Sequence, residues 1–288
     1  MSPEPTGLDL ELRAGDGFEL GATLREPAGE PACAVLINPA LGVRRRYYGR
    51  FAAFLAERGA AVLTYDPRGI GDSRPPSLRG FEARMADWGR LDTEAALRAL
   101  VERFPGVPLR VVGHSAGGQL LGFAPTAGRV DRALFVACQS AWKGNWDGLR
   151  YLWIASAWHV AVPVATALTG RLPGSLTGGE AVPAGVAREW ARWGRHPDYL
   201  LSEGGSERRQ AYARLRLRIR SLAIDDDPYA PLCAVESLLT FYGGARSELR
   251  RVAPADAGAR RLGHFGFFRA ETGGALWPGE ADWLLAAE

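Results

Sequence analysis

The chain has 288 residues, which is enough for one large hydrophobic core or two small ones. Hydrophobic residues make up 47% and charged residues 23%, which is an ordinary globular composition. The net charge is only +3, and no basic run is long enough to follow a nucleic-acid backbone, so we expect no nucleic-acid partner.

The sequence gives few indications of cellular compartment or of membrane insertion. The three cysteines are scattered without metal-ligand spacing, which suggests free thiols in a reducing compartment. Residues 1–5 carry neither the basic region nor the apolar region of a signal peptide, so we expect a cytoplasmic protein. Residues 151–168 form the most apolar stretch. We interpret it as a buried or interfacial helix and expect no transmembrane segment, which would need roughly 20 apolar residues.

The predicted elements of the first half alternate between strands and helices. Residues 8–13 and 18–25 indicate an antiparallel hairpin around the Gly-Asp-Gly turn at 15–17. From residue 32 onward, short apolar runs alternate with amphipathic stretches, which predicts a parallel sheet covered by helices on both faces. The predicted strands there are 32–37, 61–65, 109–112 and 132–138, and the predicted helices are 47–58, 88–104 and the segment after residue 115.

The alternation stops near Gln139 and resumes near residue 218. Residues 140–212 are rich in Trp, Pro and Gly and contain six of the nine tryptophans. We therefore expect three parts: an α/β core over residues 1–139, an inserted unit over 140–212 and the second part of the core over 213–288. In the last part, the predicted strands are 218–224 and 248–252, and the predicted helices are 230–242 and 276–287.

One short motif carries candidate chemistry. Residues 113–117 read GHSAG and fit G-x-S-x-G, a sharp turn between a strand and a helix that exposes a serine. The glycines have a physical reason, because bulky side chains two residues before or after Ser115 would clash in such a turn. So short a motif indicates a nucleophilic serine only if a strand precedes it and a helix follows it.

With three further motifs, the chain resembles the α/β-hydrolase superfamily. Residues 66–73 (DPRGIGDS) are similar to its D-x-R-G-x-G-x-S turn, residues 227–231 (DPYAP) to its acid loop and residues 263–266 (GHFG) to its histidine loop. Residues 183–193 and 263–269 further resemble an uncharacterised bacterial branch that is grouped with serine-aminopeptidase-like and esterase/lipase-like hydrolases. The resemblance implies an α/β fold with a mostly parallel central sheet, flanking helices and an inserted helical lid.

The order Ser, Asp, His along the chain is the order expected for a catalytic triad on this fold. Ser115 would be the nucleophile, and His264, in its glycine-flanked loop, is the best candidate for the general base among the four histidines. The acid is Asp227 if the preceding strand ends at Ile224, with Asp226 as the alternative. The two remaining aspartates of this run are expected to be solvated or to cap the next helix.

Two backbone N–H groups are expected to form the oxyanion hole. One belongs to Ala116, and the other to Ala40, with Leu41 as the alternative, because Pro39 has no N–H. Three arginines, residues 44–46, follow this loop. We interpret them as a solvated surface cluster, with recognition of an anionic substrate group as the alternative.

Together, these residues predict a serine hydrolase that cleaves a carboxylic ester of a small or acyl-chain substrate through an acyl-enzyme, with no metal and no other cofactor. Thioester, amide or peptide hydrolysis, lipolysis and acyl transfer could use the same triad, and a catalytically silent ligand-binding protein is the alternative from another class. Within the predicted lid, most tryptophans are expected to pack on the core, whereas Trp142 and Trp146 are expected to line an apolar acyl pocket.

Overall fold

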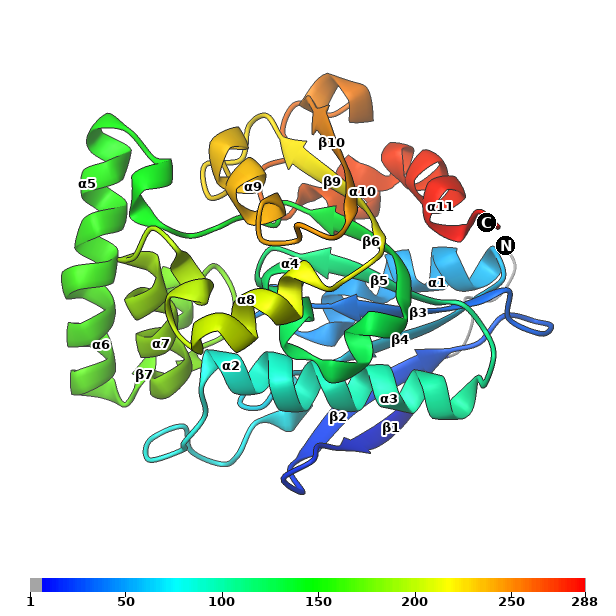
Figure 1. Cartoon of the computed structure of the whole chain (residues 1–288), viewed down its shortest axis with the longest axis horizontal. Helices are drawn as coiled ribbons and strands as arrows, with labels where there is room; N and C mark the ends of the chain where they lie inside the picture. The colour runs from blue at the N-terminus through cyan, green and yellow to red at the C-terminus, as the bar shows by residue number, and fades with distance from the viewer. Residues whose placement is uncertain (1–6, 288) are drawn as a thin grey trace.

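The computed structural model describes residues 7–287. Eight strands form one sheet in the order β1-β2-β4-β3-β5-β6-β9-β10 (Figure 1). The pairs β1–β2 and β2–β4 are antiparallel, and all the other neighbours are parallel. The strands are β1 (Leu8–Arg13), β2 (Glu19–Arg25), β3 (Cys33–Asn38), β4 (Ala60–Tyr65), β5 (Leu109–His114), β6 (Val130–Val136), β9 (Arg218–Ile224) and β10 (Arg246–Val252).

Helices cover both faces of this sheet, which confirms the predicted α/β fold with a mostly parallel sheet and flanking helices. The helices are α1 (Gly49–Glu57), α2 (Met85–Asp87), α3 (Glu94–Arg103), α4 (Ala116–Leu120), α5 (Gly148–Ser156), α6 (Val162–Thr169), α7 (Ala184–Gly194), α8 (Gly205–Ala213), α9 (Leu232–Leu239), α10 (Ala270–Gly273) and α11 (Trp277–Leu285). A separate two-stranded sheet consists of β7 (Arg171–Leu172) and β8 (Val182–Pro183).

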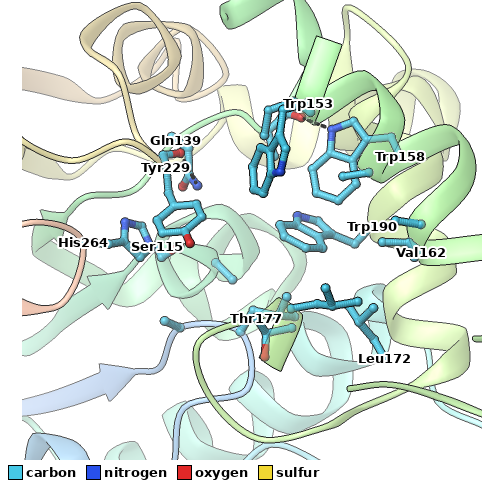
Figure 2. Close-up of a pocket in the computed structure, with 18 of the residues that line it drawn as sticks. Ser115, Gln139, Trp153, Trp158, Val162, Leu172, Thr177, Trp190, Tyr229 and His264 are labelled. Atoms are coloured by element: carbon cyan, nitrogen blue, oxygen red, sulfur yellow. Dashed lines mark hydrogen bonds between the residues drawn. The ribbon is translucent and has the colours of Figure 1, made fainter. Parts of the chain in front are cut away.

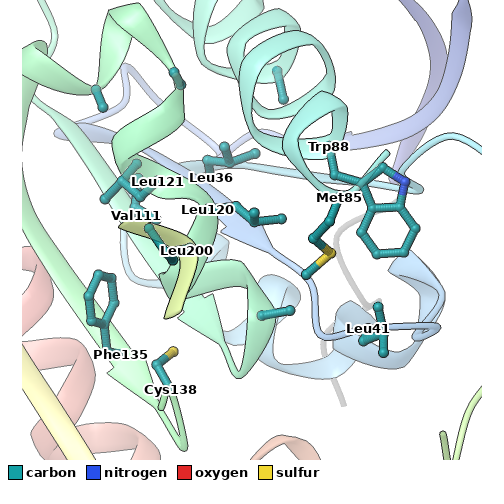
Figure 3. Close-up of a cluster of buried hydrophobic side chains, with 14 of the residues drawn as sticks. Leu36, Leu41, Met85, Trp88, Val111, Leu120, Leu121, Phe135, Cys138 and Leu200 are labelled. Carbon is teal, nitrogen blue, oxygen red and sulfur yellow. The ribbon is translucent and has the colours of Figure 1, made fainter. Parts of the chain in front are cut away.

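The hydrophobic core has two layers because side chains alternate along each strand. In β3, Val35 and Ile37 pack in a cluster with α1 and α11, whereas Ala34 and Leu36 pack in a second cluster with α3. Figure 3 shows part of the second cluster, in which Leu200 from the segment between β6 and β9 joins core side chains. This segment therefore shares the hydrophobic core of the sheet.

The segment between β6 and β9 carries α5–α8 in place of a simple crossover. A π-helical turn (Ala157–Ala161) connects α5 to α6, so that Gly148–Thr169 is one continuous helix at the edge of the molecule (Figure 1). It has 22 residues, and its most apolar 18 residues have a mean hydropathy of 1.4, so that it is long and apolar enough to cross a membrane by length and composition alone. Ser156, His159 and Pro163 lie inside this helix and do not end it.

Two of the differences from the predicted elements have local reasons. β6 ends at Val136, two residues early, because Ala137 has a φ of 52°, which turns the chain out of the sheet. The helix predicted from Trp88 begins as a π-helical turn (Trp88–Thr93) before it continues as α3. The early end of β6 matters for the site, because the chain leaves the sheet there toward Gln139 and the inserted helices.

Candidate active site

Ser115 lies in the turn between β5 and α4. Its φ of 51° is in the left-handed region, which costs a residue other than glycine about 1–3 kcal/mol. Both flanking glycines are required by close backbone packing. A Cβ atom on Gly117 would lie 2.0 Å from the carbonyl oxygen of Asn38, and one on Gly113 would lie 2.7 Å from the nitrogen of Gly118. The strand, turn and helix that the motif needs are therefore present.

His264 and Asp227 form a buried hydrogen-bonded pair on two loops that follow strands. Nδ1 of His264 lies 2.6 Å from Oδ2 of Asp227, and Oδ1 of Asp227 accepts the N–H of Tyr229 at 2.8 Å. A carboxylate only accepts hydrogen bonds, so Nδ1 carries the proton and Nε2 is left as the basic nitrogen. Ser115 and His264 line the same cavity, where Figure 2 shows them side by side.

The three consecutive aspartates have three different partners. Asp227 holds His264, as described above, whereas Asp226 accepts the N–H groups of Leu262 at 3.1 Å and Gly263 at 2.8 Å. Asp225 accepts a hydrogen bond from Arg251 at 2.9 Å. Asp225 is exposed, as expected, whereas the expectation is wrong for Asp226, because the loop before His264 lies close enough for Asp226 to bind its backbone.

A buried chain of hydrogen bonds runs behind the site. The Ala40 N–H donates to the Tyr48 hydroxyl at 2.9 Å, and that hydroxyl lies 2.9 Å from Nδ1 of His114. Nε2 of His114 lies 2.8 Å from the carbonyl oxygen of His264. Since a carbonyl only accepts, His114 is neutral with its proton on Nε2, and the Tyr48 hydroxyl donates to Nδ1. Sequence reasoning missed Tyr48, whose contact becomes visible only in the folded chain.

These contacts bear on the expected oxyanion hole. Ala40, Leu41 and Ala116 all line the cavity beside Ser115. The N–H of Ala40 is already donated to Tyr48. Between residues 7 and 287, no acceptor is bonded to the N–H groups of Leu41 and Ala116. The preference for Ala40 over Leu41 is therefore reversed by the structure.

The cavity is apolar over most of its wall and polar near Ser115 (Figure 2). At the polar end, Gln119 donates to the carbonyl oxygen of Gln139 at 2.8 Å and accepts from the Tyr199 hydroxyl at 2.8 Å. The aromatic lining residues are Trp146, Trp153, Trp158, Trp190, Tyr229 and Phe265. The wall facing Ser115 comes largely from α5, the π-helical turn, α6 and α7.

The two tryptophans predicted to reach the site have different positions. Trp146 lines the cavity, and its indole N–H donates to the Pro228 carbonyl oxygen at 3.2 Å. Trp142 is not among the lining residues, and its ring instead lies over Gly144. This corrects the expectation for Trp142, because the turn over Lys143–Asn145 directs the two rings to different surroundings. Sequence reasoning also missed Trp190, which follows Ser115 by 75 residues.

The three arginines after the oxyanion loop are all paired with carboxylates. Arg45 is only 4% exposed and pairs with Asp66 and Asp72, so the interpretation as a solvated cluster is wrong for this residue. Arg46 is also paired with Asp72, and Arg44 binds Glu180 in the segment between β6 and β9. Glu180 also donates its N–H to the Gly42 carbonyl oxygen at 2.7 Å. The contacts of Glu180 with Arg44 and Gly42 hold the loop after β3 against that segment.

The sheet order and the serine in its strand–turn–helix are those of the α/β-hydrolase fold. Residues 29–170 match the family model described as serine aminopeptidase, S33. Among curated proteins, no significant match to the sequence is found. Over the part of the chain that the structure describes, no group of three or more His, Cys, Asp or Glu side chains is arranged to hold a metal ion.

Several solved structures share the fold. A soluble variant of monoglyceride lipase from Saccharomyces cerevisiae, in complex with a substrate analog, is 15% identical with a TM-score of 0.69, over 99% of this chain and 98% of that chain. A thermostable carboxyl esterase from Bacillus coagulans is 13% identical with a TM-score of 0.63, over 98% of this chain and 99% of that chain. A serine hydrolase without a lid from Xanthomonas campestris is 15% identical with a TM-score of 0.56, over 98% of this chain and 97% of that chain.

Proposed function

We propose that this protein is a serine hydrolase that cleaves a carboxylic ester through a covalent acyl-enzyme. The observation that carries the proposal is the 2.6 Å hydrogen bond between His264 and Asp227, beside a serine held at positive φ in the same cavity. A neutral histidine oriented by a carboxylate is the arrangement that activates a serine hydroxyl. The match to a family of serine hydrolases supports the same chemistry.

In the proposed reaction, Ser115 attacks the ester carbonyl carbon while Nε2 of His264 takes the hydroxyl proton. Asp227 stabilises the imidazolium that forms, since its carboxylate accepts the Nδ1 proton. The negative oxygen of the tetrahedral intermediate is bound by the free N–H groups of Ala116 and Leu41. His264 then protonates the leaving alkoxide, and a water molecule hydrolyses the acyl-enzyme by the same steps.

We further propose that the apolar cavity binds the acyl group and that residues 140–212 act as a lid over it. Three of the six aromatic lining residues, Trp153, Trp158 and Trp190, come from α5, the π-helical turn and α7, and Trp158 and Trp190 pack edge to face with their ring centroids 4.4 Å apart. Such a wall suits an acyl chain better than a charged group, since burial of an unpaired charge is costly. An apolar acyl ester is therefore the proposed substrate class.

The first test is hydrolysis of p-nitrophenyl esters from acetyl to decanoyl. The wild-type protein should hydrolyse them, and Ser115→Ala should lower kcat on the order of 10⁴-fold with an unchanged circular dichroism spectrum. Thioesters and amides with the same acyl group extend the comparison to the other reactions of this triad. A Ser115→Ala variant that keeps near-normal turnover would contradict the proposal.

The acyl site has its own test on one helix. Ala157 lines the cavity, whereas Ala155 of the same helix does not. Ala157→Phe should fill the cavity and lower kcat/KM for octanoyl relative to acetyl esters by about tenfold or more, because only the longer chain needs that space. Ala155→Phe is the matched control and should leave the ratio unchanged. Equal ratios in the two variants would place the acyl chain elsewhere.

A further inference from the structure

The outer face of the helix Gly148–Thr169 is apolar and exposed. Leu149 is 85% exposed, Leu168 71% and Leu152 60%, and only 22% of the most apolar 18 residues of the helix are buried. Monomeric proteins rarely expose a contiguous apolar patch of this kind, and those that do use it to bind a partner or a lipid surface. We call this patch the outer face; it consists of Leu149, Leu152, Trp153, Val160, Val164 and Leu168.

The opposite side of the same helix is fixed to the protein. Ile154, Trp158 and Val162 are buried and line the cavity of Ser115. Because one side of this helix is packed against the rest of the protein, the helix can lie on the surface of a lipid bilayer but cannot cross the bilayer by itself. The helix lies at the edge of the molecule and packs against α7 (Figure 1).

The outer face is continuous with the mouth of the cavity. Trp153 belongs to both, since it is 58% exposed and also lines the cavity, and Figure 2 shows its ring near those of Trp158 and Trp190. Leu176 and Tyr229 are likewise exposed large side chains that line the cavity. Exposed apolar side chains therefore lead from the outer face into the cavity of Ser115.

The charges around the outer face are mostly positive. Residues 147–179 contain two arginines, Arg150 and Arg171, and one acidic residue, Asp147, which directly precedes the helix. Both arginines are exposed, and they stand near the two ends of the helix. Cationic side chains beside an apolar helical face with Trp and Tyr are suited to anionic lipid headgroups.

We propose that the outer face docks on an anionic phospholipid surface and that the ester substrate enters the cavity from that surface. The second half of this statement rests on the proposed hydrolase function, whereas the docking itself does not. The leucines of the outer face would enter the boundary of the acyl chains, and Arg150 and Arg171 would remain at the level of the headgroups.

The experiment is co-sedimentation with vesicles of phosphatidylcholine with or without about 30% phosphatidylglycerol. The wild-type protein should bind the anionic vesicles, and binding should weaken in ~0.5 M NaCl because salt screens the headgroup charge. Leu149→Asp/Leu152→Asp should bind at least about tenfold more weakly. Leu8→Asp is the control, since Leu8 is 58% exposed on β1, outside the outer face.

Two further measurements separate docking from catalysis. Ser115→Ala should bind vesicles as the wild type does, and Leu149→Asp/Leu152→Asp should keep its acetyl-ester hydrolysis in solution. Loss of hydrolysis by the wild type with vesicle binding intact would overturn only the proposed function. The docking proposal is overturned if the wild type does not bind, or if the double variant binds equally well. It is also overturned if that variant merely abolishes a lipid-free dimer in sedimentation velocity.

Discussion

Acidification should destabilise this protein through His114. Burial lowers the pKa of His114 from 6.5 to about 3, and the neighbouring His264 also disfavours its charge. Because this pKa is lower in the folded protein, the unfolded chain binds the additional proton between those two values. The free energy of unfolding therefore falls as the pH falls through that range, and the contribution of His114 is complete above the unfolded pKa.

The size of the pH effect on stability follows from the shift in the pKa of His114. One proton changes the free energy of unfolding by at most about 1.4 kcal/mol per pH unit, so the whole range corresponds to roughly 4–5 kcal/mol. This is a large part of the 5–15 kcal/mol typical of a folded domain. Asp92 acts in the opposite direction, because burial raises its pKa to about 6. The effect of His114 must therefore be measured as a difference between two proteins.

The comparison is urea denaturation of the wild type and His114→Gln, followed by tryptophan fluorescence between about pH 7 and pH 4. Glutamine is neutral and can accept from Tyr48 and donate to the His264 carbonyl oxygen, but it cannot bind the proton. The stability advantage of the wild type should shrink by about 1 kcal/mol for each pH unit below 6. If His114→Gln does not fold, NMR titration of the His114 ring in the wild-type protein replaces the denaturation experiment. The reasoning would be refuted if the difference in the free energy of unfolding between the two proteins did not change with pH, or if the His114 ring titrated near its ordinary pKa.

Three other predictions concern named side chains. Tyr48→Phe leaves a backbone N–H and a histidine nitrogen unpaired, so urea denaturation should show a loss of about 1–3 kcal/mol, and a loss below about 0.5 kcal/mol would argue against the buried chain. Asp227→Asn should lower kcat on the order of 10⁴-fold, whereas Asp225→Asn, paired with a surface arginine, should stay near wild type; equal losses would contradict the assigned acid. Trp190→Ala should reduce kcat/KM for octanoyl esters more than for acetyl esters, and Trp142→Ala should leave that ratio unchanged; the reverse result would place Trp142 in the acyl site.

The sheet and the serine turn could be predicted because their signals are local. Short apolar runs such as residues 32–37 and 61–65 are typical of buried parallel strands, and both are strands in the structure. The glycines around Ser115 are needed for backbone contacts that any chain with this turn must make. Spacing also indicated which of three aspartates lies beside His264.

The remaining features depend on contacts between distant segments. The choice between Ala40 and Leu41 depends on where the Tyr48 hydroxyl lies, which no pattern in the loop reveals. Likewise, Trp142 and Trp146 are four residues apart, and only the turn between them decides which ring lines the cavity. The helix over residues 148–169 is apolar on both sides, so periodicity alone could not distinguish a buried side from an exposed one.

The central claim is that Ser115 is an activated nucleophile, and covalent labelling tests it most directly. The protein is treated with a fluorophosphonate probe, digested and analysed by mass spectrometry. The account predicts one adduct, on Ser115, which forms much more slowly in Asp227→Asn because the histidine is no longer oriented by a carboxylate. A wild-type protein that takes up no probe would be a silent ligand-binding protein, and a label on another residue would contradict the assigned site.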